Sequence, residues 1–209
     1  MKSDFLQDRS RICVFGASSE QIPQASKDFA YELGILLAEN GFGLVFGAGT
    51  SGLMGACARG VHLKNGEIIG VIPEKLNKPG IYFEFCTERI ETKTMHERKA
   101  LMEELSSGFI ALPGGFGTLE ELMEVLTLKQ LGYHSKPIII ANLSGYYDAI
   151  IEQFERCVAD GFTHPAFMEL FTVAATPEQI IEQLKSYKAH DMPEKTEMLL
   201  NHQYSSSRN

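Results

Sequence analysis

The residues best suited to chemistry lie in two stretches of the sequence, and the first contains Arg98. Residues 94–99 are typical of a helix start, with Thr94 as N-cap and Glu97 at the capping-box position. By helical spacing, Arg98 lies on the apolar stripe of this helix, which comprises Leu101, Met102 and Leu105. A guanidinium that points inward needs an anionic partner, either a ligand or a structural carboxylate, unless its head reaches water while its stem packs. Lys99 could flank the same site, and we expect His96 to be a surface or packing histidine rather than a ligand.

The second stretch contains Glu121, for which the sequence supports two interpretations. Thr118 and Glu121 have the spacing of a capping box, so Glu121 could simply bond back to the Thr118 N–H. Glu121 also stacks over Val125 and Leu128 on a helix, which favours a position against an apolar wall. Glu120 instead stacks over the polar Glu124 and Thr127. A carboxylate beside an anion site would indicate chemistry on the group attached to the anion.

Three glycine-rich turns, at residues 16–19, 47–52 and 113–118, each follow an expected strand. Glycine permits a close backbone approach, and the free N–H groups of the next helix favour an anion. One such turn could meet a purely steric need, but three together predict a ligand that carries phosphate. Neither G-x-G-x-x-G nor G-K-S/T is present, which argues against a dinucleotide cofactor and a P-loop. The candidate binding residues in these turns are Ser18, Gly47, Gly49, Gly114, Gly115, Phe116, Gly117 and Thr118.

The elements that must position these residues alternate between short apolar runs and longer segments of helical period. The expected strands are Ile12–Phe15, Leu44–Phe46, Ile68–Ile72, Phe109–Leu112 and Pro137–Ala141. The expected helices are a segment through Phe29 and Leu37 that ends at Asn40, then residues 53–62, 94–105, 118–131 and 146–159, and one opened by Thr176.

Apolar strands that alternate with helices predict an α/β fold with a Rossmann-like, doubly wound parallel sheet flanked by helices. Ligands bind beyond the carboxyl ends of the strands in such sheets, where the glycine-rich turns lie. We expect a single domain over residues 1–187 and a polar C-terminal tail over residues 188–209.

Composition excludes several classes of function. The 209 residues carry a formal net charge of −8, which disfavours a protein that coats nucleic acid. Four scattered cysteines without C-x-x-C spacing argue against a zinc site and a disulfide framework, and fit a reducing cytosol. Residues 1–11 lack the apolar core of a signal peptide, and no apolar run is long enough to span a bilayer. We therefore expect a soluble cytoplasmic protein without a membrane partner.

Two motifs give the sequence a specific family resemblance. Residues 113–121 read PGGFGTLEE and residues 95–99 read MHERK, and these resemble the PGGxGTxxE and MHxRK signatures of the Lonely Guy (LOG) family. The resemblance extends from about Ile12 to Leu184. This family comprises cytokinin riboside 5′-monophosphate phosphoribohydrolases, relatives of which have carried the label lysine decarboxylase.

The resemblance implies a homodimeric Rossmann-like enzyme that hydrolyses the N-glycosidic bond of AMP-like nucleotides. Arg98 and Glu121 would be catalytic, and no metal or redox cofactor is expected. Nucleotide-binding residues would be Met95, Lys99, Gly115, Gly117, Thr118 and Thr127. The sequence departs from the family where Gly16-Ala17-Ser18 replaces a C-G-S turn and where Lys78-Pro79-Gly80-Ile81 replaces a usual Arg-Glu pair. The second departure removes the Glu carboxylate, which in the family is associated with substrate binding, so it bears on base preference. Glu84 is a candidate replacement for that carboxylate.

The mechanism implied is a dissociative cleavage with oxocarbenium character on the ribose. Glu121 would stabilise that cation through the ribose hydroxyls or activate the attacking water, and Arg98 would offset negative charge on the leaving base. Three alternatives remain at this level: a non-catalytic nucleotide-binding module, a pyridoxal-phosphate lysine decarboxylase and a structural scaffold. The decarboxylase alternative lacks an evident lysine in a Schiff-base context.

Overall fold

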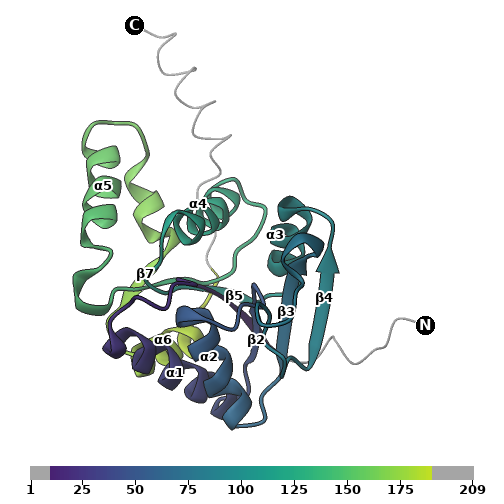
Figure 1. Ribbon diagram of the computed structural model, residues 1–209. Coiled ribbons are helices and arrows are strands. Elements are labelled where there is room, and N and C mark those ends of the chain that lie inside the picture. The colour runs from purple at the N-terminus through teal and green to yellow at the C-terminus, as the bar shows by residue number, and fades with distance from the viewer. Residues whose placement is uncertain (1–9, 190–209) are drawn as a thin grey trace, which may run out of the picture.

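The fold is built on one seven-stranded sheet in which all strands run parallel, in the order β4-β3-β2-β1-β5-β6-β7 (Figure 1). The computed structural model describes residues 10–189. The strands are β1 (Arg11–Phe15), β2 (Gly43–Phe46), β3 (Ile68–Pro73), β4 (Glu88–Thr92), β5 (Gly108–Ala111), β6 (Ile138–Ala141) and β7 (Thr172–Ala174). The chain winds outward from β1 to β4 and then returns to the other side of β1 at β5. The predicted doubly wound sheet is therefore confirmed, with its switch point between β1 and β5.

Helices cover both faces of the sheet (Figure 1). One face is covered by α1 (Gln24–Glu39), α2 (Gly52–Leu63) and α6 (Pro177–Ser186), and the other by α3 (Met95–Glu104), α4 (Phe116–Gln130) and α5 (Asp148–Ala159). Three short 3₁₀ helices lie in the connections: η2 (Glu74–Leu76), η3 (Leu143–Gly145) and η4 (Pro165–Leu170). Because both faces are covered, β1, β2, β3, β5 and β6 are buried along their whole length.

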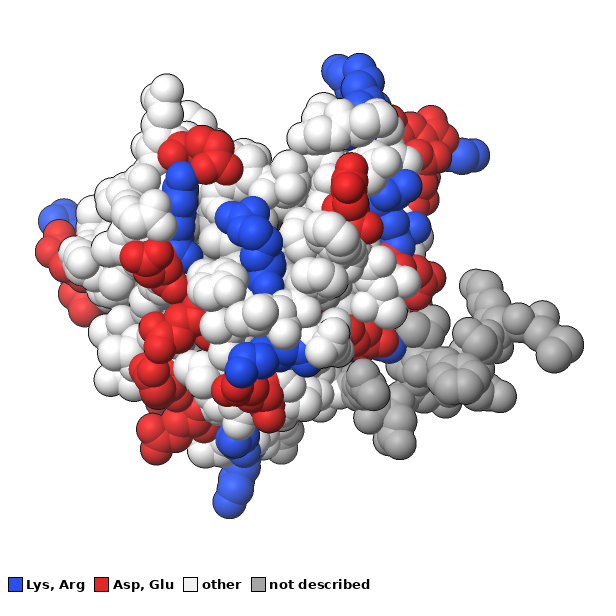
Figure 2. Space-filling view, turned by 60° about the horizontal axis from the view of Figure 1, so that its bottom comes forward, with Lys and Arg blue, Asp and Glu red and all other residues white. Residues whose placement is uncertain are grey.

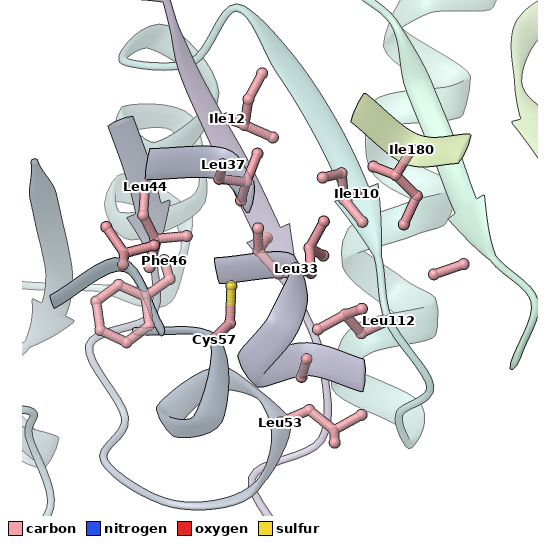
Figure 3. Packing of buried hydrophobic residues seen from close by; sticks show 14 of the residues in the cluster. Ile12, Leu33, Leu37, Leu44, Phe46, Leu53, Cys57, Ile110, Leu112 and Ile180 are labelled. Carbon is pink, nitrogen blue, oxygen red and sulfur yellow. The ribbon is translucent and has the colours of Figure 1, made fainter. Parts of the chain in front are cut away.

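Two hydrophobic cores hold the layers together, one on each side of the sheet. On the first side, Leu33 of α1 and Leu53 of α2 pack against strand residues such as Phe46 and Ile110 (Figure 3). On the second side, Met102 of α3 and the α4 residues Leu122 and Val125 pack under the sheet with strand residues such as Phe109. Arg98 and Met102 thus share the inward face of α3, as the helical spacing predicts.

The structure differs from the sequence predictions at four elements: β4, β7, α4 and α5. Strand β4 was not predicted because it lies at the edge of the sheet and its residues, ERIET, are mostly exposed. Strand β7, at the other edge, has only three residues. Helix α4 begins at Phe116, two residues before the predicted start, because Gly115 takes an extended conformation and serves as N-cap. Helix α5 begins later than predicted, at Asp148, after the short 3₁₀ turn.

The surface of the described residues carries charges of both signs (Figure 2). On the face shown in Figure 2, acidic and basic side chains of the described residues are interspersed. No helix in residues 10–189 is long and apolar enough to cross a membrane. Apart from Lys188 and Ala189, the predicted polar tail lies outside the described residues.

Candidate active site

A cleft of about 590 Å³ lies at the carboxyl ends of β1, β2, β3 and β5. All three predicted glycine-rich turns contribute to it, together with one residue from α3 and several from α4. Its lining from the turns and α4 is Gly16, Ala17, Ser18, Gly47, Gly49, Ser51, Gly115, Phe116, Gly117, Thr118 and Glu121. The remainder is Arg98 and four apolar residues, Met54, Ile72, Leu76 and Ile81. The prediction that the three turns lie together at the carboxyl ends of the strands is therefore confirmed.

Arg98 reaches the cleft from the first turn of α3. Thr94 caps this helix by accepting a hydrogen bond from the Glu97 N–H at 3.1 Å, while Glu97 accepts one from the Lys93 N–H at 2.8 Å. The residue is only 8% exposed, and its Nε donates to the Val71 carbonyl at 3.2 Å. The alternative in which the guanidinium reaches open water is thus excluded, and the head is fixed at the floor of the cleft.

Gly47 is required for this placement of Arg98. A Cβ atom built on Gly47 would overlap Nη2 of Arg98 and come within 3.0 Å of Cζ. Glycine at the end of β2 therefore leaves the space that the guanidinium occupies. The following residue, Ala48, adopts a left-handed conformation with φ of 59°, which is uncommon outside glycine and turns the chain sharply at the cleft.

Glu121 faces Arg98 across the cleft. Its Oε1 lies 3.4 Å from Nη1 of Arg98, and its side chain is 12% exposed. Burial raises the pKa of this carboxyl, while Arg98 opposes the rise and the neighbouring Glu120 adds to it. The guanidinium and carboxylate thus form a buried pair that opens onto a space of ligand size.

The capping-box interpretation of Glu121 is wrong. A capping-box glutamate occupies the third helical position, but α4 is capped by Gly115, which places Thr118 third and Glu121 sixth. Thr118 is instead buried, and its side chain fills the space where a Cβ on Gly114 would lie. The early helix start frees Glu121 to point into the cleft, as its stacking over Val125 predicts.

The amino end of α4 forms an anion seat at one side of the cleft. No side chain caps this helix, so N–H groups of its first turn lack an intrahelical acceptor. A Cβ built on Gly115 or Gly117 would meet nothing within 4 Å, so the backbone there is open to a ligand. The loop itself is fixed, because Ala17 N–H donates to Pro113 O at 3.0 Å and Tyr146 Oη donates to Gly114 O at 2.7 Å. This arrangement suits a phosphate.

Two predicted binding residues, Lys99 and Thr127, lie away from this cleft. Lys99 follows Arg98 on α3 and is rotated about 100° around the helix axis, where its Nζ forms ion pairs with Glu120 and, at 2.9 Å, with Glu124. The expectation that Lys99 flanks the same site is therefore wrong for this single chain. Thr127 lies further along α4, on an exposed part of the helix that borders a separate apolar groove.

The other predicted residues lie in or next to the cleft. Gly114 is buried behind the anion seat, and Phe116 stands at the rim with 93% of its surface exposed. Met95 is 45% exposed, and its Sδ is 3.9 Å from Nη1 of Arg98. Neither it nor Gly114 is part of the lining.

Sequence reasoning missed the apolar part of the cleft. Met54, Ile72, Leu76 and Ile81 belong to α2, β3 and the β3–β4 connection, and none was among the predicted site residues. Gly80 is exposed with φ of 83°, and Glu84 is exposed and outside the lining. The proposed replacement of the missing carboxylate by Glu84 is therefore wrong. The available signal was the pair of apolar residues, Leu76 and Ile81, in a segment otherwise rich in Lys, Pro and Gly.

Within residues 10–189, no group of three or more His, Cys, Asp or Glu could hold a metal ion. No lysine of the described part of the chain lines the cleft either, so a Schiff base has no anchor there. The charged groups available for chemistry in the lining are Arg98 and Glu121.

Comparisons with known proteins show the family to which the chain belongs. A family model described as "Possible lysine decarboxylase" matches residues 54–184. The "Probable cytokinin riboside 5′-monophosphate phosphoribohydrolase LOGL2" of Oryza sativa subsp. japonica is 42% identical over 177 residues, which cover 85% of this chain and 72% of the relative. The "Cytokinin riboside 5′-monophosphate phosphoribohydrolase LOG3" of Arabidopsis thaliana is 40% identical over 177 residues, which cover 85% of this chain and 82% of that relative.

Solved structures share the fold at lower identity. A molybdenum cofactor binding protein from Rippkaea orientalis superimposes with a TM-score of 0.68 at 24% identity, covering 86% of this chain and 98% of that chain. The molybdenum cofactor carrier protein from Chlamydomonas reinhardtii gives a TM-score of 0.66 at 22% identity, and the match covers 86% of this chain and 99% of that chain. At this identity the likeness bears on the fold alone.

Proposed function

The chain belongs to the LOG family of phosphoribohydrolases, and from that premise we propose that it hydrolyses the N-glycosidic bond of AMP or an N6-modified AMP. The products are the free base and ribose 5-phosphate. The observation that carries the proposal is the buried Arg98–Glu121 pair, which opens onto the same cleft as an uncapped helix end. A phosphate at the helix end would hold the sugar against the pair.

The reaction needs an attacking water and a leaving base. Water oxygen bonds to C1′ while the C1′–N bond breaks, and the base departs with the bonding electrons and gains the proton that water loses. As C1′ becomes cationic, the Glu121 carboxylate stabilises the positive charge through the ribose hydroxyls or orients the water. Arg98, fixed by the Val71 carbonyl and Gly47, offsets the negative charge that develops on the base.

Substrate binding is assigned to the backbone around the cleft. Gly115, Phe116, Gly117 and Thr118 present N–H groups to the 5′-phosphate, and the turns that contain Ser18, Gly47 and Gly49 contact the rest of the nucleotide. Phosphate binding restricts the ribose to one orientation, which lowers the entropic part of the barrier. The chemistry assigned to these residues uses no metal or redox cofactor.

The experiment that tests this function is a product assay. We expect ribose 5-phosphate and free base from AMP or N6-isopentenyl-AMP, and much less product from the matching nucleosides, because they lack the phosphate. Tight nucleotide binding without product over long incubation would instead indicate a non-catalytic binding module. Release of cadaverine from lysine with added pyridoxal phosphate would contradict the proposal.

We further propose that two copies of the chain pair through the face formed by α4 and α5. An apolar groove on this face is lined by Met123 and Thr127 of α4 and Phe154 of α5, among others. Helix α5 has an apolar stripe through Ile150 and Phe154, yet none of its residues is fully buried. A second copy would cover this stripe and bring a partner's surface next to Thr127.

Light scattering after size exclusion tests the pairing. We expect twice the 23.2-kDa chain mass, and a shift towards the single mass for Met123→Glu, because a buried carboxylate opposes an apolar interface. Lys185→Glu, on the opposite face of the sheet, serves as the control. A single mass for the unaltered protein would overturn this part of the proposal.

A cytoplasmic location is also proposed, since four free thiols fit a reducing compartment.

A further inference from the structure

The amino end of α2, which borders the cleft, is not capped by its own N-cap residue. Ser51 is at the N-cap position, but its side chain accepts no hydrogen bond from a helix N–H. Its Oγ instead donates to the Ser18 carbonyl at 2.9 Å, in the turn that follows β1. Because the first N–H groups of a helix have no intrahelical acceptor, this helix end needs acceptors from another segment.

The turn after β1, residues 16–20, supplies these acceptors. Oε1 of Glu20 accepts from the Gly52 N–H at 2.9 Å, and the Ala17 carbonyl accepts from the Leu53 N–H at 2.8 Å. Gly52 has a φ of 64°, and a Cβ built on it would lie 2.2 Å from the Ala17 carbonyl oxygen. The turn therefore packs directly on the helix end, and Glu20 serves as the side-chain cap that Ser51 does not provide.

An ion pair with α1 fixes the Glu20 carboxylate in this position. Its second oxygen, Oε2, lies 2.6 Å from Nζ of Lys27, which also donates to the Glu20 backbone carbonyl at 3.0 Å. The Lys27 ammonium and the Gly52 N–H lower the pKa of Glu20, so this carboxyl is ionised at neutral pH. A negative charge also suits the positive end of a helix dipole. Glu20 thus joins α1, the turn and α2 at one point.

The same turn forms part of the cleft wall and is bonded to the loop of the anion seat. Ala17 and Ser18 line the cleft. The Ala17 N–H donates to the Pro113 carbonyl at 3.0 Å, at the start of the loop that leads to the amino end of α4. Ala17 is therefore held through its carbonyl by α2 and through its N–H by the seat loop. A turn that is loose on α2 would leave the seat loop without a fixed partner.

We propose that Glu20 is a positioning residue for the substrate phosphate, because it caps α2 and so holds the turn after β1 against the anion seat. This role rests on the proposed function, since it concerns how the nucleotide binds in the same cleft. Glu20 does not line the cleft itself, so it acts through Ala17 and Ser18. Its side chain is 60% exposed, so replacing it opens no cavity in the core and the protein should stay folded.

The first test measures KM and kcat with AMP or N6-isopentenyl-AMP, whichever releases ribose 5-phosphate. We expect Glu20→Ala to raise KM by about fivefold, as for a lost helix cap, and to change kcat by less than about twofold, because the catalytic pair is untouched. Glu20→Gln should restore most of the KM, because its amide oxygen can still accept from the Gly52 N–H. Glu39→Ala is the matched control, since it removes an exposed ion pair with Lys64 at the carboxyl ends of α1 and α2, and it should leave KM unchanged.

Amide hydrogen exchange provides a second test that does not depend on activity. The N–H groups of Gly52, Leu53 and Ala17 lie on the path from Glu20 to the anion seat. We expect all three to exchange about fivefold faster in Glu20→Ala, and to keep the rates of the unaltered protein in Glu39→Ala. Glu20→Gln should stay close to the unaltered protein.

The role of Glu20 is overturned if Glu20→Ala leaves KM unchanged, if it lowers kcat more than it raises KM, or if the Ala17 N–H keeps its exchange rate. Absence of ribose 5-phosphate from every nucleotide would contradict the proposed function instead. In that case the exchange rates and the calorimetric Kd of AMP still test Glu20. An equal Kd in Glu20→Ala and the unaltered protein would then reject its role in phosphate binding.

Discussion

Nη1 of Arg98 lies 3.4 Å from Oε1 of Glu121, and the two side chains come from neighbouring helices, α3 and α4, on one face of the sheet. The distance exceeds the 2.7–2.9 Å that is usual for a charge-assisted hydrogen bond. The pair is therefore close enough to share a substrate without being closed into a tight bridge. Arg98 has a second anchor at the Val71 carbonyl, so its position does not depend on Glu121 alone.

Gly47→Ala should reduce kcat by about 100-fold or more, since the added methyl group must displace the Arg98 guanidinium and small misplacements of catalytic groups carry costs of that size. A double-mutant cycle provides the control. If Gly47 acts through Arg98, Gly47→Ala should cost little further activity in an Arg98→Ala background. Full additivity of the two losses would show that Gly47 affects the reaction by another route.

As pH is lowered, activity should begin to fall at a higher pH than expected for an ordinary glutamate, whose pKa is about 4.3. Burial raises the pKa of Glu121, and the proposed reaction requires its ionised form, so activity is lost as pH falls through the raised value. The facing charged groups are Arg98 and Lys99, which lower this pKa, and Glu120 and Glu124, which raise it.

Charge changes near Glu121 should shift the pH at which activity falls on the acid side, which is called the acid limb of the pH profile. Lys99→Met should shift the acid limb of kcat to higher pH, and Glu120→Gln should shift it to lower pH, because the first removes a cation and the second an anion near Glu121. The pH profile of kcat for each variant measures the shift. Limbs that coincide with that of the unaltered protein would mean that a group other than Glu121 sets the profile.

Tyr146→Phe and Tyr147→Phe form a matched pair with opposite expectations. Tyr146 Oη donates to Gly114 O at 2.7 Å behind the anion seat, so its loss should raise KM several-fold while the protein stays folded. Tyr147 Oη donates to Leu112 O at 2.6 Å in the core, where it is 1% exposed, so its loss should cost about 1 kcal/mol of unfolding free energy. Steady-state kinetics and denaturant titration of both variants distinguish the effects, and equal KM values would contradict the role of Tyr146.

The sequence predicted the parts of the site that depend on local periodicity. Arg98 could be placed inward because its helix has one apolar stripe, and the three turns could be placed together because parallel strands end at one edge. The start of α4 was misjudged because Thr118 resembles an N-cap, whereas the extended backbone of Gly115 decides where the helix begins.

The remaining features depend on tertiary contacts that local patterns do not encode. Lys99 and Arg98 are adjacent in sequence, but the position of α4 decides that Lys99 meets Glu120 and Glu124 outside the cleft. Edge strand β4 has a polar pattern because part of its surface faces water. The rim at Leu76 and Ile81 lies in a connection without regular period, so nothing in the spacing indicated that it returns over the β2 turn.

The most direct test of the account compares Glu121→Gln with the unaltered protein, using the release of ribose 5-phosphate for kcat and calorimetry for the Kd of the nucleotide. Glutamine keeps the size of the side chain and removes its charge. We expect kcat to fall by about 100- to 10,000-fold while Kd stays within about threefold, since the carboxylate acts on the charge that develops in the transition state. An unchanged kcat, or a loss confined to nucleotide binding, would contradict the catalytic role of the Arg98–Glu121 pair.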